Sequence, residues 1–190
     1  MLFLDADEII SEEFKNELRN TLPHTTQNGF WLNYSIHFMG KKLRGGYPLK
    51  KLALFRVGKG MYERIDEEHW SLLDMEIHEH PIIEGPVGYI KRQIDHIDDR
   101  GIDHYVAKHN EYAKWEAARL LKSKIDAAVR SKWTWKQKIK YSLMATPFLT
   151  PIYYVASLIF LGGFIDGRRG FQFAKLKASY FWKVYQLTRN

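Results

Sequence analysis

The chain has 190 residues, 45% of them hydrophobic and 15% aromatic, which is enough for about one to one and a half domains with a buried core. It has no cysteine, which excludes a disulfide framework, a thiolate zinc site and a cysteine nucleophile. The net charge of +7 is uneven: residues 1–100 carry 13 Lys and Arg against 17 Asp and Glu, whereas residues 101–190 carry 16 against 5. An acidic first half and a basic second half suggest that the two parts of the chain have different functions. The basic half could face nucleic acid or an anionic membrane.

The first stretch, residues 2–8, is an apolar run that ends in Asp5-Ala6-Asp7-Glu8. Such a run predicts a buried strand that delivers two carboxylates to a sheet edge, where open α/β sheets bind their ligands. Two carboxylates one residue apart can hold a hard divalent cation and leave its other positions to water and phosphate oxygens. The alternative is a solvated turn that caps the next helix, which is the commoner outcome for so short a motif.

A helix and two strands are predicted next. Ser11 is the expected N-cap of a helix that runs to about Leu22, because acidic residues follow it in the first turn and apolar residues recur at helical spacing. Pro23 ends this helix. Residues 29–39 are rich in aromatic and β-branched side chains and predict a strand, and residues 51–57 predict another.

A basic loop with two glycines, Arg44-Gly45-Gly46-Tyr47-Pro48, lies between these predicted strands. Glycine allows a backbone to approach a ligand closely, and Arg44 would then be available to a phosphate or a sugar. An ordinary hairpin loop explains the same residues equally well.

Residues 63–80 are strongly acidic and contain three histidines. The run 76–80 (EIHEH) alternates like an edge strand, and it is not His-Glu-x-x-His, so a zincin-type site is not indicated. A solvated acidic loop, a metal cluster and a general base at a strand end all remain open, and the pattern alone favours the first. Further on, His96 lies between apolar neighbours near acids, which is more typical of a core histidine than of a metal ligand.

The second half is predicted to be helical. Residues 102–122 show helical spacing of apolar side chains. Residues 141–165 carry no charge and could cross a bilayer, but Pro147 and Pro151 interrupt a straight helix and basic residues flank both sides. An interfacial or re-entrant segment is therefore favoured over a membrane span or a buried soluble core. Residues 167–190 predict an amphipathic helix suited to a lipid headgroup boundary, or else a surface helix of a soluble domain.

Short motifs follow one another along the chain in a characteristic order: FLDADE at 3–8, HFMG at 37–40, RGGYP and KLALFRVGKG within 44–60, IHE at 77–79, EGPVG at 84–88, DHID at 95–98 and FIDGRRGF at 164–171. This ordered set resembles the second half of a bacterial family-2 glycosyltransferase with the GT-A fold, of the lipopolysaccharide and capsule type. The resemblance implies an α/β fold. A truncated GT-A-like mixed sheet with flanking helices would occupy residues 1–100. A helical basic region would follow over residues 101–190, with a membrane-associating segment at about 141–189.

The resemblance also implies roles for single residues. Asp5 and Asp7 would bind Mg²⁺ or Mn²⁺ on the donor diphosphate, and His96 would reach the same metal or the diphosphate. Glu79 would be the catalytic base, which must come within hydrogen-bond reach of the acceptor hydroxyl. The other residues expected near donor or acceptor are Arg44, Gly45, Gly46 and Glu76.

The implied function is transfer of a sugar, with inversion, from a nucleotide-sugar donor to a lipid-linked, lipopolysaccharide or polysaccharide acceptor. The enzyme would be peripheral or re-entrant at the cytoplasmic face of the inner membrane. The resembling enzymes carry further N-terminal strands with the nucleotide-base pocket, so we expect this chain to be the C-terminal half of such an enzyme. A non-catalytic membrane-surface or partner-binding module is the alternative. Nucleic-acid binding ranks lowest, because the positive charges border an uncharged stretch instead of forming a continuous polar groove.

Overall fold

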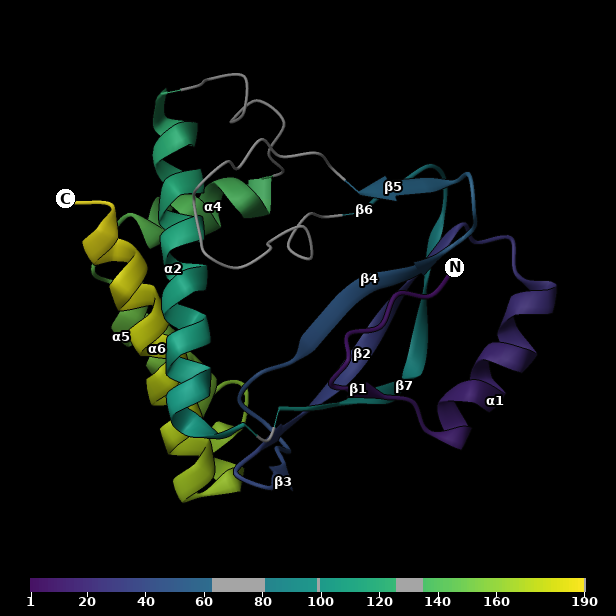
Figure 1. The fold of residues 1–190 in the computed structure, drawn as a ribbon, viewed down its shortest axis with the longest axis horizontal. Coiled ribbons are helices and arrows are strands. Elements are labelled where there is room, and N and C mark those ends of the chain that lie inside the picture. The colour runs from purple at the N-terminus through teal and green to yellow at the C-terminus, as the bar shows by residue number, and fades with distance from the viewer. Residues whose placement is uncertain (63–80, 99, 126–134, 190) are drawn as a thin grey trace.

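The computed structural model describes residues 1–62, 81–98, 100–125 and 135–189. The protein is an α/β protein with a mixed sheet and flanking helices, as the sequence predicts at this level. Figure 1 shows α2, α5 and α6 gathered to the left of the strands and α1 to their right.

The described strands and helices divide at about residue 100. The strands are β1 (Glu8–Ile9), β2 (Gly29–Phe38), β3 (Lys41–Lys42), β4 (Leu49–Phe55), β5 (Gly60–Tyr62), β6 (Pro81–Ile83) and β7 (Val87–Ile97). The helices are α1 (Glu12–Thr21), α2 (Gly101–Ile125), α4 (Trp135–Met144), α5 (Leu149–Leu158) and α6 (Arg168–Leu187), with 3₁₀ turns η1 (Leu22–His24) and η3 (Gly163–Asp166). Of these helices, only α1 lies among the strands in sequence.

The central strand of the main sheet is β2. It pairs in parallel with β7 on one side and antiparallel with β4 and the short β3 on the other. The two-residue strand β1 adds to the outer edge of β7 in antiparallel orientation. Strands β5 and β6 form a separate two-stranded sheet.

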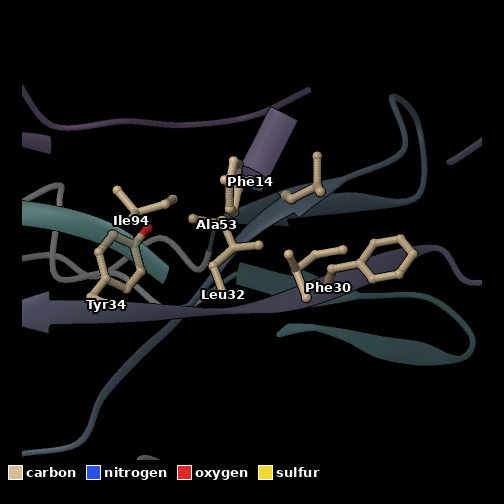
Figure 2. Close-up of a cluster of buried hydrophobic side chains, with 8 residues drawn as sticks. Phe14, Phe30, Leu32, Tyr34, Ala53 and Ile94 are labelled. Carbon is tan, nitrogen blue, oxygen red and sulfur yellow. The ribbon is translucent and has the colours of Figure 1, made fainter. Parts of the chain in front are cut away.

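Alternation along β2 explains the first hydrophobic core. Side chains two residues apart lie on one face of a strand, and Phe30, Leu32 and Tyr34 are all buried on the face that meets α1. Figure 2 shows Phe30, Leu32 and Tyr34 on the same side of β2, with Leu32 directly below Phe14 of α1. Helix α1 begins as predicted, because the backbone N–H of Phe14 donates to Ser11 Oγ at 3.1 Å.

The helices and the sheet share a second core at the far end of β2. Ile36 and Phe38 continue the buried face of β2 and pack with Leu43 and with Phe173 of α6. A third cluster joins α2, α4 and α6 around Leu120, among others. The two halves of the chain are therefore held together by shared apolar contacts as well as by the polypeptide.

The predicted buried strand at residues 2–4 is wrong. Met1 and Phe3 are hydrogen-bonded along the outer edge of β4, with Phe3 N to Ala53 O at 2.9 Å, yet Phe3 and Leu4 are 38% and 41% exposed. The run lies at the edge of the sheet, where one side of the backbone and much of each side chain meet solvent. Residues 4–7 then carry the chain from the β4 edge across to the β7 edge.

The uncharged stretch 141–165 is not one helix. Helix α4 ends at Met144, α5 follows from Leu149, and η3 closes the stretch. Pro151 lies in the first turn of α5, where its missing N–H costs no intrahelical hydrogen bond. None of the helices in the described ranges is both long and apolar enough to cross a membrane.

Candidate functional site

The acidic turn, residues 5–8, is placed by hydrogen bonds to the end of β7. Pairing of β1 with β7 sets Glu8 opposite His96, and the N–H of Ile97 donates to the carbonyl of Asp7 at 2.8 Å. The turn is closed by Glu8 N to Asp5 O at 3.0 Å and by Asp5 N to Glu8 Oε2 at 3.1 Å. Sheet pairing thus brings the Asp-x-Asp motif beside His96.

Lys51 of β4 reaches the same turn from the opposite edge of the sheet. Its Nζ lies 2.6 Å from Asp5 Oδ2 and 2.5 Å from Glu8 Oε1, and 5.1 Å from the ring centre of Tyr34. The Glu8 side chain is only 1% exposed, whereas those of Asp5 and Lys51 are about one-third exposed. Two carboxylates of the turn therefore share one ammonium group.

These contacts shift the three pKa values. Burial alone would raise the pKa of Asp5, but the hydrogen bond and charge of Lys51 outweigh it and hold the pKa below its ordinary value. Burial raises the pKa of Glu8 despite the same lysine. Burial would lower the pKa of Lys51, but its hydrogen bonds to both carboxylates raise it. The lysine is accordingly charged at neutral pH.

Asp7 faces other partners. Its Oδ1 lies 3.4 Å from His96 Nδ1 and its Oδ2 lies 3.7 Å from an Arg100 nitrogen. His96 Nδ1 is buried and makes no hydrogen bond within the described part of the chain. Burial lowers the pKa of His96, although the charge of Asp7 opposes this shift. The imidazole is thus held in the neutral form, which is the form that binds metals.

The residues of the turn fit a divalent ion only in part. Among the described residues, no group of three or more His, Cys, Asp or Glu side chains is arranged to hold a metal. Asp5 is directed to Lys51, which leaves Asp7 with His96 as the available pair. Because Mg²⁺ is usually bound by one or two carboxylates together with substrate phosphates and water, Asp7 can supply one of its oxygen ligands, with the unpartnered His96 Nδ1 beside it.

Arg44, Gly45 and Gly46 lie at a different place, which we call the loop junction: residues 44–47 packed on residues 157–166. The buried carboxylate of Asp166, 4% exposed, accepts from the backbone N–H of Arg44 at 2.9 Å and of Gly45 at 3.0 Å. The Arg44 guanidinium also pairs with Asp166 and bonds to the carbonyl of Ile165. The contacts of Arg44 are therefore with the C-terminal half of the chain.

The two glycines allow a close backbone approach, as the sequence suggests, and the group approached is η3 with the end of α5. A Cβ on Gly45 would collide with the carbonyl of Gly162, and Gly46 has a φ of +84°. The Gly46 N–H donates to Leu161 O at 2.7 Å, and Ser157 Oγ donates to Gly46 O at 2.7 Å. Their present geometry accounts for both glycines without a ligand.

The predicted base Glu79 and its neighbour Glu76 lie outside the described residues. Sequence reasoning missed two other residues, Lys51 and Asp166. Lys51 carried a weak signal, since it is a charge inside a strand pattern. Asp166 carried a stronger one: it is the sole carboxylate side chain of residues 127–190 and directly follows the uncharged stretch.

A second polar group, also missed, joins β2, β3 and β7. Asp95 Oδ1 accepts from Ser35 Oγ and lies 3.2 Å from His37 Nε2 and 3.8 Å from Lys42 Nζ. Burial would raise the pKa of Asp95, but the Ser35 and His37 hydrogen bonds lower it below its ordinary value. Ser35 bonds to Asp95 instead of to His37, so the group lacks the nucleophile-to-base contact of a hydrolase.

Comparisons of the chain with protein-family models, with curated proteins and with solved structures find no match. The likeness of the motifs to a glycosyltransferase consequently stays a hypothesis. The chemistry of the acidic turn and the surface of the helical half are the features from which a function can be inferred.

Proposed function

We propose that this chain belongs to an inverting, family-2-type glycosyltransferase that uses Mg²⁺ or Mn²⁺. The donor would be a nucleotide sugar and the acceptor a lipid-linked, lipopolysaccharide or polysaccharide hydroxyl. The observation that carries the proposal is the meeting of Asp7 and His96, which are far apart in sequence, beside Asp5 at the end of β7. Ligand sites at the ends of strands are typical of α/β sheets.

The residues divide the chemistry as follows. Asp7 and His96 would hold the ion, which neutralises charge on the departing nucleoside diphosphate. Arg100, beside Asp7, adds a further positive charge at the same place. Glu79 would accept the proton of the acceptor hydroxyl while that oxygen attacks the anomeric carbon. The diphosphate leaves with the electron pair of the broken bond, so that the configuration inverts in one displacement.

The test is donor turnover by the purified protein together with any N-terminal part encoded with it. With Mn²⁺ and a panel of nucleotide sugars, we expect release of nucleoside diphosphate. We expect at least about a hundredfold loss in Asp7→Ala and in Glu79→Gln, since such groups contribute on the order of 10²–10⁴. The matched control is Asp103→Ala, an exposed aspartate in the first turn of α2. Unchanged turnover in both site variants would reject these assignments.

We also propose that the helical half binds an anionic membrane surface at the cytoplasmic face of the inner membrane. One face of α5, at spacings of three and four residues, is exposed and apolar, and the exposed apolar surface continues into η3. Its members are Phe148, Ile152, Val155, Ile159, Phe160, Leu161, Phe164 and Ile165. Exposed Arg168 and Lys175 follow at the start of α6. A continuous apolar surface with nearby cations is typical of an interfacial contact.

Flotation with lipid vesicles tests the membrane proposal. We expect binding to anionic vesicles that weakens with salt, and loss of binding in the double variant Ile152→Ser/Ile159→Ser. The control is Val57→Ser, which changes an apolar residue that is even more exposed and lies far from α5 in sequence. Equal binding by the double variant and the control would reject the assigned face.

The exposed face of α5 also favours a second candidate function, a membrane-surface or partner-binding module without catalysis. Both functions predict vesicle binding, so vesicle binding does not distinguish them. Metal-dependent binding of a nucleoside diphosphate does: the transferase requires it and requires Asp7, whereas the module predicts no dependence on Asp5 or Asp7.

A further inference from the structure

The acidic turn already contains a cation, the ammonium of Lys51. It lies at 2.6 Å from Asp5 and at 2.5 Å from Glu8, which are distances of direct, charge-assisted hydrogen bonds. The Glu8 side chain is buried, and its other oxygen accepts from the N–H of Asp5. Lys51 therefore contacts the side chains of both Asp5 and Glu8, and Glu8 is in turn hydrogen-bonded to the backbone of the turn.

A divalent ion on Asp5 would meet this ammonium directly. Two positive charges within a few ångströms repel each other, and the repulsion is screened less where the groups are half-buried. Lys51 and Asp5 are each about one-third exposed, and Glu8 is buried. An ion can therefore use the Asp5 carboxylate only if Lys51 moves away from it.

We propose that Lys51 is a built-in counter-ion of the acidic turn, which competes with a divalent metal for the carboxylate of Asp5 and confines the metal to Asp7 and His96. This inference rests on the proposed function, because the ion is the one that would accompany the donor diphosphate. A diphosphate that drew Lys51 onto its own oxygens would release Asp5 to the ion. Lys51 would thereby couple metal binding to donor binding.

The test is Mn²⁺ affinity in the absence of any sugar donor, followed by the electron paramagnetic resonance signal of free Mn²⁺. We expect Lys51→Met to bind Mn²⁺ at least about tenfold more tightly than the parent protein, since a competing unit charge is removed. If Lys51 only held the turn in shape, Lys51→Met would damage the turn and lower the affinity for Mn²⁺. A higher affinity for Mn²⁺ would therefore indicate that Lys51 competes with the ion. Adding Asp5→Asn to Lys51→Met should abolish the gain.

The matched control is Lys50→Met. Lys50 is the preceding residue of β4, is exposed, and extends toward the ring of Tyr89 at 5.9 Å instead of toward the acidic turn. Successive side chains of a strand point to opposite faces, so this control removes the same charge from the same strand. Its Mn²⁺ affinity should equal that of the parent protein.

Lys51→Met leaves the buried carboxylate of Glu8 without its cation, which is destabilising enough to unfold a marginal chain. The double variant Lys51→Met/Glu8→Gln removes that carboxylate charge as well and retains Asp5, Asp7 and His96. Circular dichroism then establishes that the variant is folded before Mn²⁺ is added. The expected gain in affinity is the same as for Lys51→Met.

Two results would overturn the inference. One is a folded double variant that binds Mn²⁺ no more tightly than the parent protein. The other is Mn²⁺ binding that is undetectable at millimolar concentration in every protein tested. If the Lys51 variants gain affinity but the protein turns over no donor, the proposed transferase function fails and the counter-ion inference stands. If donor turns over with unchanged Mn²⁺ affinity in the Lys51 variants, only the inference fails.

Discussion

The acidic turn and the loop junction both rest on carboxylates, but they use them differently. In the turn, Asp5 and Asp7 are partly exposed, and their charged partners are the side chains of Lys51 and Arg100. At the junction, the buried Asp166 accepts from two backbone N–H groups of residues 44 and 45. Side-chain cations can move to another anion, whereas backbone donors cannot. The turn can exchange partners, and the junction holds the halves of the chain together.

The environment of His109 provides a further fixed contact between the 44–48 loop and the helical half. His109 stacks on Tyr105 at 3.8 Å between ring centres, and its Nε2 lies 3.3 Å from Lys177 Nζ, which also sits over the ring of Tyr47 at 4.4 Å. Burial, followed by the charge of Lys177, lowers the pKa of His109 to about 3. A neutral histidine and a lysine over aromatic rings thus join the 44–48 loop to α2 and α6.

The largest expected effect is that of Asp166→Ala on stability. It leaves the N–H groups of Arg44 and Gly45 without their acceptor, and a buried donor without a partner costs about 1–3 kcal/mol, so we expect a total loss of about 3 kcal/mol. Urea unfolding measures it, with Asp103→Ala as the control expected to change little. A loss below about 1 kcal/mol would mean that the junction is not held by this carboxylate.

The next effect is a pH dependence of stability that comes from His109. The pKa of His109 is lower in the folded protein than in the unfolded chain, so the unfolded chain binds the proton more readily. The neutral His109 therefore contributes fully to the stability of the fold above the unfolded pKa near 6.5. This contribution is lost as the pH falls toward about 3. His109→Gln should flatten the decline in the free energy of unfolding between pH 6.5 and 4 by about 3 kcal/mol. The same slope in the variant would contradict the neutral, buried histidine.

Gly45→Ala should cost about 2 kcal/mol, because the added Cβ collides with the Gly162 carbonyl, which is backbone and cannot rotate away. Gly40→Ala serves as the comparison, because a Cβ added at Gly40 would have no atom within 4 Å, although the φ of Gly40 is +70°. A left-handed backbone alone costs about 1 kcal/mol. Thermal unfolding of the two variants compares close approach with backbone strain, and equal costs would rule out close packing at residue 45.

The smallest effect on stability is expected at the acidic turn. Asp7→Asn should change the free energy of unfolding by less than about 1 kcal/mol, because Asp7 lies 3.7 Å from Arg100 and 3.4 Å from the neutral His96, and both distances are long. The same variant should weaken Mn²⁺ binding. A large loss of stability would instead assign Asp7 a structural role like that of Asp166 and remove the contrast between the two regions.

Local features were predictable from the sequence. Helix α1 begins after Ser11, strand β2 spans Gly29–Phe38 and helix α2 spans Gly101–Ile125, all close to the predicted bounds. Capping, alternation and helical spacing depend on neighbours within a few residues, so they can be read from one stretch of chain. Residues 2–4 were predicted wrongly because burial of a strand depends on its place in the sheet, which local sequence does not contain.

The acidic motif, the uneven charge, the mixed α/β class and the absence of cysteine chemistry follow from the order of residues alone. The partners of each carboxylate were decided by the tertiary structure. Lys51 meets Asp5 across 46 residues and Asp166 meets Arg44 across 122, through strand order and through packing of α5 and η3 on a loop. Such contacts form only when distant segments share a core, because buried apolar area outweighs the entropy of closing a long loop.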